Sequence, residues 1–299
     1  MTHQPRQAAS FMVFAMLIIG LIDNYISVIA QDVSLWQFQF TRACMGLPLL
    51  VIVSYFGFAS IRPIRLWAVL VRNGFIAVGM LFYFGALAFM PIAQALAGLF
   101  TAPIFVLLIS VFVFGEKVGA LRIMAILFGF AGIVVVLGPS GGEISVLNFL
   151  PVFGGLFYAM GSVATQKLCA KESTVAMLAG LFSLQGLIGL LALTVLAIWQ
   201  PEAPIGTDGF LVRGLIWPTG LTWALIGVQA VGSLIGVGFL IRAYQSAEPS
   251  FVAVFEYSVF IFGPFFGYIL LGQEVTLNQM IGIAMIAAAG SLIALRSNN

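Results

Sequence analysis

The chain has 299 residues, of which 62% are hydrophobic and only 7% are charged, and its mean hydropathy is +1.15. Soluble globular domains carry about 25% charged residues, so a soluble protein is excluded and lipid must be the main solvent. The net charge of +2 includes no basic cluster, so nucleic acid is not expected as a partner. With a single histidine and two cysteines, no metal site, disulfide framework or cofactor is expected.

Apolar runs bounded by Pro, Gly and charged residues predict about ten membrane-spanning helices of about 20 residues each. Proline disfavours helical backbone in the residue before it, so the longest apolar stretch is divided at Met90-Pro91. The run after Arg6 also fits a signal peptide, but it has a counterpart in the second half, which favours a span. The expected spans are 10–30, 35–57, 66–89, 91–114, 118–138, 147–167, 174–199, 217–244, 249–271 and 276–295.

The distribution of Lys and Arg predicts that both termini lie in the cytoplasm, because cytoplasmic loops carry an excess of these residues. Arg42 and Arg213 are the two exceptions, expected toward the outside. Short loops and the lack of an Asn-x-Ser/Thr sequence fit a multi-pass protein of the bacterial inner membrane. The basic residues expected at cytoplasmic helix ends are Arg6, Arg62, Arg65, Lys117, Arg122, Lys167, Lys171, Arg242 and Arg296.

The two halves of the chain resemble each other, because segment 82–118 matches segment 239–275 at an offset of 157 positions. Each half holds five expected spans, and an odd number makes the halves insert in opposite directions. We therefore expect two inverted five-helix repeats, an N-terminal one at 1–138 and a C-terminal one at 147–299. Inverted repeats are typical of secondary transporters, whose substrate site lies at the membrane midplane between the repeats.

Short motifs in two spans indicate a family. Phe114-Gly115-Glu116 ends the fourth span, Leu271-Gly272-Gln273-Glu274 ends the ninth, and Glu256-Tyr257 lies inside the ninth. Together with the span layout, they resemble the drug/metabolite transporter superfamily, in its EamA-type branch, and among its members the bacterial YddG-type aromatic amino-acid exporters. The motif loops differ, Gly-Glu-Lys against Gly-Gln-Glu, so neither loop glutamate is assigned to the site.

The resemblance implies an all-α membrane protein of ten transmembrane helices in two inverted five-helix repeats. It also implies a secondary transporter that exports small amino acids or related metabolites, with aromatic and hydrophobic amino acids favoured. Transport would proceed by alternating access through a central cavity.

Ionisable residues inside the expected spans need an explanation, because each charge costs about 2.5–3.5 kcal/mol on insertion scales. Asp23, near the middle of the first span, is either a substrate amine acceptor or proton carrier, or a polar clamp to Arg42. Glu256 is either functional or a buried glutamate paired with backbone or a tyrosine hydroxyl. Arg42 is interpreted as structural or gating. Arg72, near the inner end of the third span, is expected to extend toward the interface.

Uncharged polar side chains complete the candidate site. Asp23 and Ser27 fall opposite Tyr158 and Ser162 at an offset of 135, and each pair lies on one helix face at i, i+4 spacing. Met80 offers a soft, adaptable wall. For each of these residues, interhelical hydrogen bonding or packing is an equal alternative. The candidate substrate-binding residues are Asp23, Asn24, Ser27, Met80, Tyr83, Tyr158, Ser162, Gln229, Ser233, Glu256 and Tyr257.

We expect spans 1, 3, 4, 6, 8 and 9 to line the cavity and the other spans to support it. One alternative is an exporter of another metabolite or drug, such as a nucleobase, a nucleoside or a cationic drug. A phosphate-bearing substrate is disfavoured, because only Arg42 and Arg72 could receive it. The other alternative, a membrane-embedded enzyme, would need clustered His, Cys or acidic residues, so no enzymatic activity is expected. The expected partners are a small-molecule substrate and the lipid bilayer, and a monomer is expected.

Overall fold

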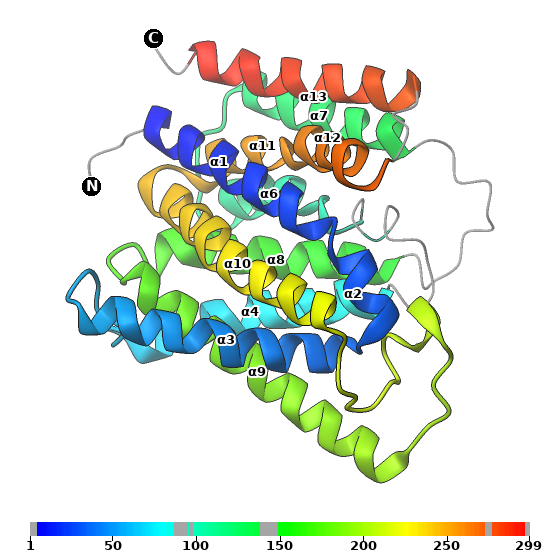
Figure 1. Ribbon diagram of the computed structural model, residues 1–299. Helices are drawn as coiled ribbons and strands as arrows, with labels where there is room; N and C mark the ends of the chain where they lie inside the picture. Colours follow the sequence, from blue (N-terminus) through cyan, green and yellow to red (C-terminus); the bar gives the residue numbers. More distant parts are fainter. Residues whose placement is uncertain (1–4, 87–94, 96–97, 138–148, 273–276, 297–299) are drawn as a thin grey trace.

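The structure is a computed structural model that describes residues 5–86, 95, 98–137, 149–272 and 277–296 (Figure 1). The expected helix boundary at Met90-Pro91 lies outside the described residues. The helices are α1 (Pro5–Asp23), α2 (Ile26–Asp32), α3 (Leu35–Tyr55), α4 (Leu66–Ala86), α6 (Ala102–Phe112), α7 (Ala120–Leu137), α8 (Leu150–Lys167), α9 (Thr174–Trp199), the 3-10 helix η2 (Gly206–Gly209), α10 (Gly220–Ser246), α11 (Pro249–Glu256), α12 (Val259–Leu271) and α13 (Leu277–Arg296).

Every span that the sequence predicts contains helix within the described residues. By length and composition, six helical segments of the described chain are long and apolar enough to cross a membrane. Large apolar side chains such as Trp199 and Leu191 are exposed on their outer faces, as expected for surfaces in contact with lipid. The six segments are Pro5–Asp32, Leu35–Tyr55, Leu66–Ala86, Thr174–Trp199, Gly220–Ser246 and Pro249–Leu271.

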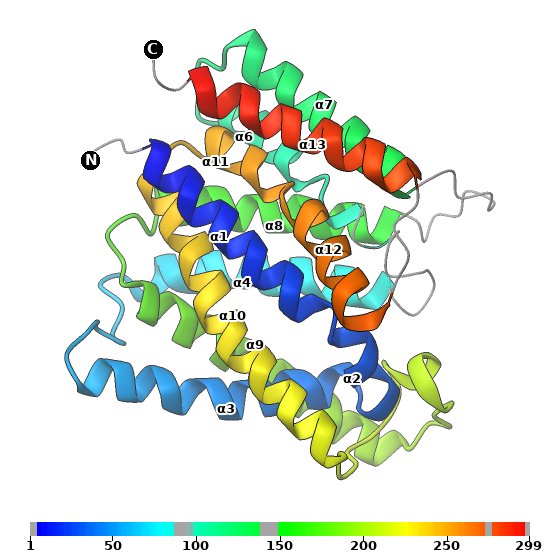
Figure 2. The same ribbon diagram turned by 45° about the horizontal axis from the view of Figure 1, so that its top comes forward.

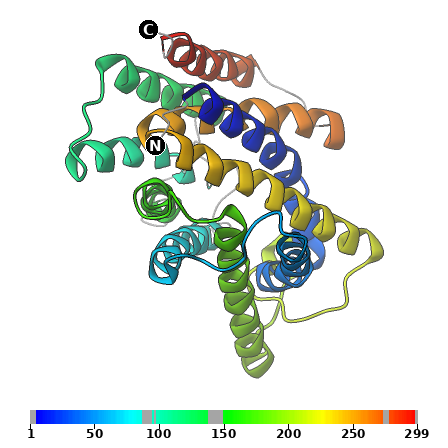
Figure 3. The ribbon, with the colours of Figure 1, turned by 90° about the vertical axis from the view of Figure 1, so that its left-hand side faces the viewer.

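The most extensive helix packings each join the first half to the second. Helix α4 packs on α8, α1 on α10, α7 on α13 and α3 on α9. Figures 1 and 3 show α7 and α13 together at one edge of the bundle and α3 and α9 at the opposite edge. Spans 1 and 3 correspond to spans 6 and 8 in the repeat, so the α4–α8 packing is the counterpart of the α10–α1 packing. The two halves are therefore interlocked along their length.

Glycine lets the two halves cross closely between α4 and α8. A Cβ atom on Gly79 would lie 2.9 Å from the Gly154 carbonyl oxygen, and a Cβ on Gly154 would lie 2.9 Å from the Gly79 oxygen. Gly236, which is 157 positions after Gly79, faces α1 in the matching packing, where its Cβ would lie 3.1 Å from Ile19 Cγ1. Small residues at such crossings allow backbones to approach, which supplies packing energy between helices in lipid.

Three of the spans are interrupted within the described residues. The first span breaks after Asp23, where α1 ends and α2 begins two residues beyond Asn24. The fourth span turns at Phe100-Thr101 before α6 begins, and the ninth breaks at Tyr257-Ser258 between α11 and α12.

The breaks in the fourth and ninth spans are equivalent in the repeat, because Thr101 and Ser258 are 157 positions apart. The Thr101 hydroxyl donates to the Gly98 carbonyl at 2.6 Å, and the Ser258 hydroxyl donates to the Phe255 carbonyl at 2.7 Å. A hydroxyl that bonds a carbonyl three residues earlier competes with the helical backbone bond and accommodates a kink. Both halves therefore have the same hydroxyl-to-carbonyl hydrogen bond at equivalent breaks.

Ion pairs connect the two halves at one end of the bundle. Lys167 Nζ on α8 lies 2.9 Å from Glu116 Oε1 in the loop after α6. Arg122 Nη1 on α7 lies 2.7 Å from Glu248 Oε2 and 2.8 Å from Ser250 Oγ, just before and within α11. Helix α1 begins and α13 ends at this same end (Figure 2). The helix ends on this side are therefore joined across the repeat.

Candidate functional site

A cavity of about 150 Å³ lies between the two halves. Helices α1, α3 and α4 of the first half and α8, α9 and α10 of the second contribute to its walls. Most of the wall is apolar or aromatic, and the polar groups are few, as in most small-molecule sites. The aromatic and polar residues that line it are Asp23, Arg42, Arg72, Tyr83, Phe84, Phe100, Tyr158, Phe182, Gln185, Gln229 and Ser233.

Asp23 lies in the cavity wall at the C-terminal end of α1, where the first span breaks. It interacts electrostatically with Arg42 and forms a hydrogen bond with Gln229. Gln229 Nε2 also donates to the Ile22 carbonyl at 2.6 Å, and this carbonyl precedes the break. The carboxyl group of Asp23, at the break, and the side-chain amide of Gln229, on α10, therefore lie together in the cavity wall.

Arg42 lines the cavity and is bonded to two helices of the second half. Its Nη2 donates to Gln185 Oε1 at 2.9 Å, and its Nη1 donates to Ser233 Oγ at 3.4 Å. Its guanidinium also lies 4.9 Å from the ring centroid of Phe38 and 5.4 Å from that of Phe182. Bonds to α9 and α10 turn the side chain inward. The Arg42 guanidinium therefore connects α3 to α9 and α10.

Arg72 is also held inward, and the expectation that it extends to the interface is wrong. Only 1% of its surface is exposed. Its Nε donates to Thr165 Oγ1 on α8 at 2.9 Å, and its Nη1 donates to Asn73 Oδ1 at 2.8 Å. Because α8 packs directly on α4, Thr165 lies close enough to bond the guanidinium and hold it inside the bundle.

Glu256 is fully buried behind one wall of the cavity. Its Oε1 accepts hydrogen bonds from Tyr244 at 2.7 Å and from Tyr158 at 3.3 Å, while its Oε2 has no hydrogen-bond partner among the described residues. Tyr158 lines the cavity, so its phenol connects the cavity to the buried carboxyl.

The structure brings six of the predicted site residues together in the cavity wall: Asp23, Met80, Tyr83, Tyr158, Gln229 and Ser233. Asn24 and Ser27 lie elsewhere: Asn24 Nδ2 donates to the Gly263 carbonyl of α12 at 3.1 Å, and Ser27 Oγ donates to the Asn24 carbonyl at 3.0 Å. They stabilise the break in the first span and its crossing with α12.

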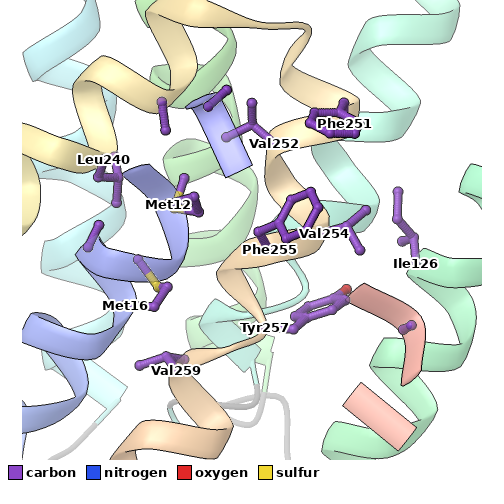
Figure 4. Packing of buried hydrophobic residues seen from close by; sticks show 14 of the residues in the cluster. Met12, Met16, Ile126, Leu240, Phe251, Val252, Val254, Phe255, Tyr257 and Val259 are labelled. Carbon is purple, nitrogen blue, oxygen red and sulfur yellow. The ribbon is translucent and has the colours of Figure 1, made fainter. Parts of the chain in front are cut away.

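Ser162, Glu256 and Tyr257 also lie outside the lining residues. Ser162 is buried beside Tyr158 and Tyr244. The Tyr257 side chain points toward α7 and α13 (Figure 4), where its ring would lie 2.5 Å from a Cβ on Gly129. A glycine there makes room for the phenol ring.

Sequence patterns alone left Arg42, Arg72, Phe182 and Gln185 out of the candidate site and placed spans 2 and 7 in the supporting layer. The structure corrects this, because α3 and α9 supply Arg42, Phe182 and Gln185 to the cavity. A usable signal was present, since two arginines and a glutamine inside apolar spans are expensive unless they face a cavity or each other.

A cavity between the two halves of a polytopic helical protein, lined in part where helices are broken, is the architecture typical of secondary transporters. The model of the EamA-like transporter family matches residues 6–138 and 147–295. The chain therefore belongs to the EamA-like transporter family, within the drug/metabolite transporter superfamily.

The similar proteins agree on transport and differ in cargo. The chain is 27% identical to a riboflavin transporter of Rhizobium johnstonii over 93% of this chain and 89% of that protein. It is 26% identical to a riboflavin transporter of Vibrio cholerae, over 97% and 94%. It is 25% identical to the pseudopaline exporter CntI of Pseudomonas aeruginosa, over 74% and 72%.

A solved crystal structure superimposes on this chain with a TM-score of 0.78 at 18% identity, covering 97% of this chain and 98% of that one. Together with the family match, this confirms the expected fold of ten transmembrane helices in two inverted five-helix repeats.

Proposed function

We propose that this protein is a secondary transporter that carries a small metabolite with an aromatic or heteroaromatic ring by alternating access through the cavity. The cavity itself supports the proposal, because aromatic walls surround a small polar group of Asp23, Arg42 and Gln229. Aromatic walls favour stacking with a planar ring, and a few fixed polar groups orient it. The sequence contains no ATP-binding P-loop motif, so the gradient of the substrate or of an ion supplies the driving force.

Aromatic amino acids are the first candidate substrates, and export is the proposed direction. Asp23 would accept the substrate ammonium, while the rings of Tyr83, Phe100 and Phe182 would contact its side chain. The similar proteins include a pseudopaline exporter and S-adenosylmethionine uptake transporters, so the proposed direction rests on the resemblance to aromatic amino-acid exporters.

Riboflavin is the second candidate, and a specific observation favours it. Two similar proteins that match nearly the whole chain are named riboflavin transporters. The flavin is a planar heteroaromatic ring with hydrogen-bonding edges, for which Gln229 and Ser233 offer polar contacts in the same cavity.

Flux measured in proteoliposomes of the purified protein tests the proposal and separates the candidates. Labelled tryptophan and labelled riboflavin are supplied in turn, each against excess unlabelled tryptophan, riboflavin, threonine and a nucleoside. Saturable flux of either label, competed by ring-bearing compounds and not by threonine, supports the proposal, and the label that moves ranks the candidates. Flux of neither label above empty liposomes, with the protein shown to be folded, overturns the ring-bearing substrate class.

We further propose that the protein lies in the bacterial inner membrane as a monomer, with both termini in the cytoplasm. The joined end of the bundle, where Lys167 and Arg122 lie, would then be cytoplasmic. Protease treatment of spheroplasts should leave a C-terminal tag intact, and a cleaved tag would reverse the orientation.

A further inference from the structure

Arg72 is a buried cation with spare hydrogen-bonding capacity at the cavity. Its side chain is 1% exposed and belongs to the cavity wall. The hydroxyl of Thr165 and the amide oxygen of Asn73 accept bonds from Nε and Nη1, and both acceptors are uncharged. A guanidinium carries further N–H donors in a planar fork, so donors are left for a ligand in the cavity.

No carboxylate forms an ion pair with Arg72 within the part of the chain that the structure describes. The groups that interact with it electrostatically are the Cys169 thiol and the Tyr158 phenol. Burial raises the pKa of the Cys169 thiol to about 11, so this thiol is neutral at physiological pH. A phenol is neutral there as well. Arg42 differs, because Asp23 faces it.

An unneutralised charge is the most costly kind of group to bury, and it is retained in membrane proteins mainly at substrate or ion pathways. Two arginines and one acidic residue line the described cavity wall. Asp23 faces Arg42, so Arg72 has no acidic partner there. On the described wall of the cavity, the Arg72 guanidinium therefore has no carboxylate beside it, and the carboxylate group of a ligand would supply one.

We propose that Arg72 binds a carboxylate of the transported metabolite, which narrows the substrate class to small aromatic carboxylates. The inference rests on the proposed function, because it places the substrate in this cavity. A planar guanidinium matches a carboxylate with two parallel hydrogen bonds. A phosphate monoester would bring between one and two negative charges to a single guanidinium without an acidic partner, so the carboxylate is the better match.

The experiment measures equilibrium binding to the purified protein in detergent with a series of indole compounds. Tryptophan and indole-3-propionate carry a carboxylate, whereas tryptophanamide and tryptamine lack it and keep the ring. Sodium chloride is added as a separate arm, because an inorganic anion could occupy the same guanidinium. In the natural protein, the carboxylates should bind at least about tenfold more tightly than the neutral or cationic partners, as expected for a bond to a charged group.

Variants locate the effect at Arg72. Arg72→Gln should abolish the preference for carboxylates, so that all four ligands bind with similar affinity. Arg72→Lys should retain part of the preference. Arg242→Gln, which removes an exposed arginine at the end of α10, is the matched control and should leave the preference intact. The thermal midpoint of Arg72→Gln should equal or exceed that of the natural protein, because a ligand-binding charge is removed from a buried site.

Several outcomes would overturn the inference. Equal preference in the natural protein and Arg72→Gln would show that the carboxylate binds elsewhere. A lowered thermal midpoint with an equal loss of all four ligands would make Arg72 a structural residue. Chloride binding that Arg72→Gln abolishes, with no preference for the carboxylates in the natural protein, would assign the site to an inorganic anion. Riboflavin flux without carboxylate binding would overturn this inference and leave the proposed function standing, whereas binding and flux of no ring compound would overturn both.

Discussion

Lys167 on α8 and Glu116 after α6 form an ion pair of 2.9 Å that joins the two repeats at one end of the bundle. Ser250 at the start of α11 donates to the other carboxylate oxygen of Glu116 at 3.3 Å. Helix α8, which carries Lys167, also supplies Tyr158 to the cavity wall. The pair therefore connects elements that must separate if this end opens to the cavity.

We expect Lys167→Gln to favour opening at this end. The two side chains are 27% and 11% exposed, and a pair of this kind contributes about 1 kcal/mol at most, or about fivefold in the opening equilibrium. The measurement is the rate at which a water-soluble maleimide labels Ser110→Cys on α6 in a background without Cys44 and Cys169. Arg242→Gln serves as the control, and equal labelling rates in all three proteins would contradict a gating role.

Gly79→Ala should destabilise the fold, because its Cβ would lie 2.9 Å from a backbone oxygen of α8 and the helices would have to separate. Overpacking of this kind costs about 1–3 kcal/mol. Gly74→Ala on the same helix is the matched control, since nothing lies within 4 Å of its Cβ, and it should be neutral or slightly stabilising. Thermal unfolding in detergent compares the two, and equal midpoints would argue against a close crossing.

Asp23 and Arg42 should be energetically coupled. Asp23→Asn and Arg42→Gln each leave one charge without its partner, so the double variant should be more stable than the sum of the single effects implies, by about 1 kcal/mol or more. Thermal or denaturant unfolding of the four proteins gives the coupling. Asp23→Asn combined with Arg242→Gln should be additive, and additivity in the first cycle as well would mean that the two charges do not interact.

Glu256 is expected to exchange a proton during transport, because its buried carboxyl reaches the cavity through Tyr158. Glu256→Gln should then flatten the pH dependence of flux, while Tyr244→Phe, which keeps the carboxyl, should retain it. The profile is measured in proteoliposomes with the transported label. An unchanged profile in both Glu256→Gln and Asp23→Asn would exclude proton coupling through either residue.

The helical fold could be predicted from the sequence because the apolar runs in this chain are bounded by Pro, Gly and charged residues. The expected spans 35–57 and 174–199 differ from α3 and α9 by two residues or fewer at either end. The repeat could be predicted because the segment that contains Gly115 recurs around Gly272 at a constant offset of 157 positions. Both signals are local or periodic, and neither requires knowledge of which helices touch.

The site was predictable only in part, because side-chain direction depends on contacts between distant segments. Arg42 faces the cavity through a bond to Gln185, 143 positions away, and Arg72 does so through Thr165, 93 positions away. Nothing in the local sequence of α3 or α4 specifies these partners. Tyr257 illustrates the reverse error: its neighbour Glu256 faces the cavity wall, and the next residue along a helix necessarily points elsewhere.

The matched breaks at Thr101 and Ser258 have a consequence for how the chain assembles. Pro249–Leu271 is apolar enough to enter a membrane as one span, although it ends as two short helices, α11 and α12, and the latter has only 13 residues. Inserted alone, such a segment can bond only to its own backbone and hydroxyls, because lipid offers no partners, and this favours a continuous helix until neighbouring helices dock. The kink therefore arises when neighbouring helices dock, which makes it a late event in biogenesis. Both repeats must complete this step before a cavity exists, so the functional centre of the protein is among the last parts to form.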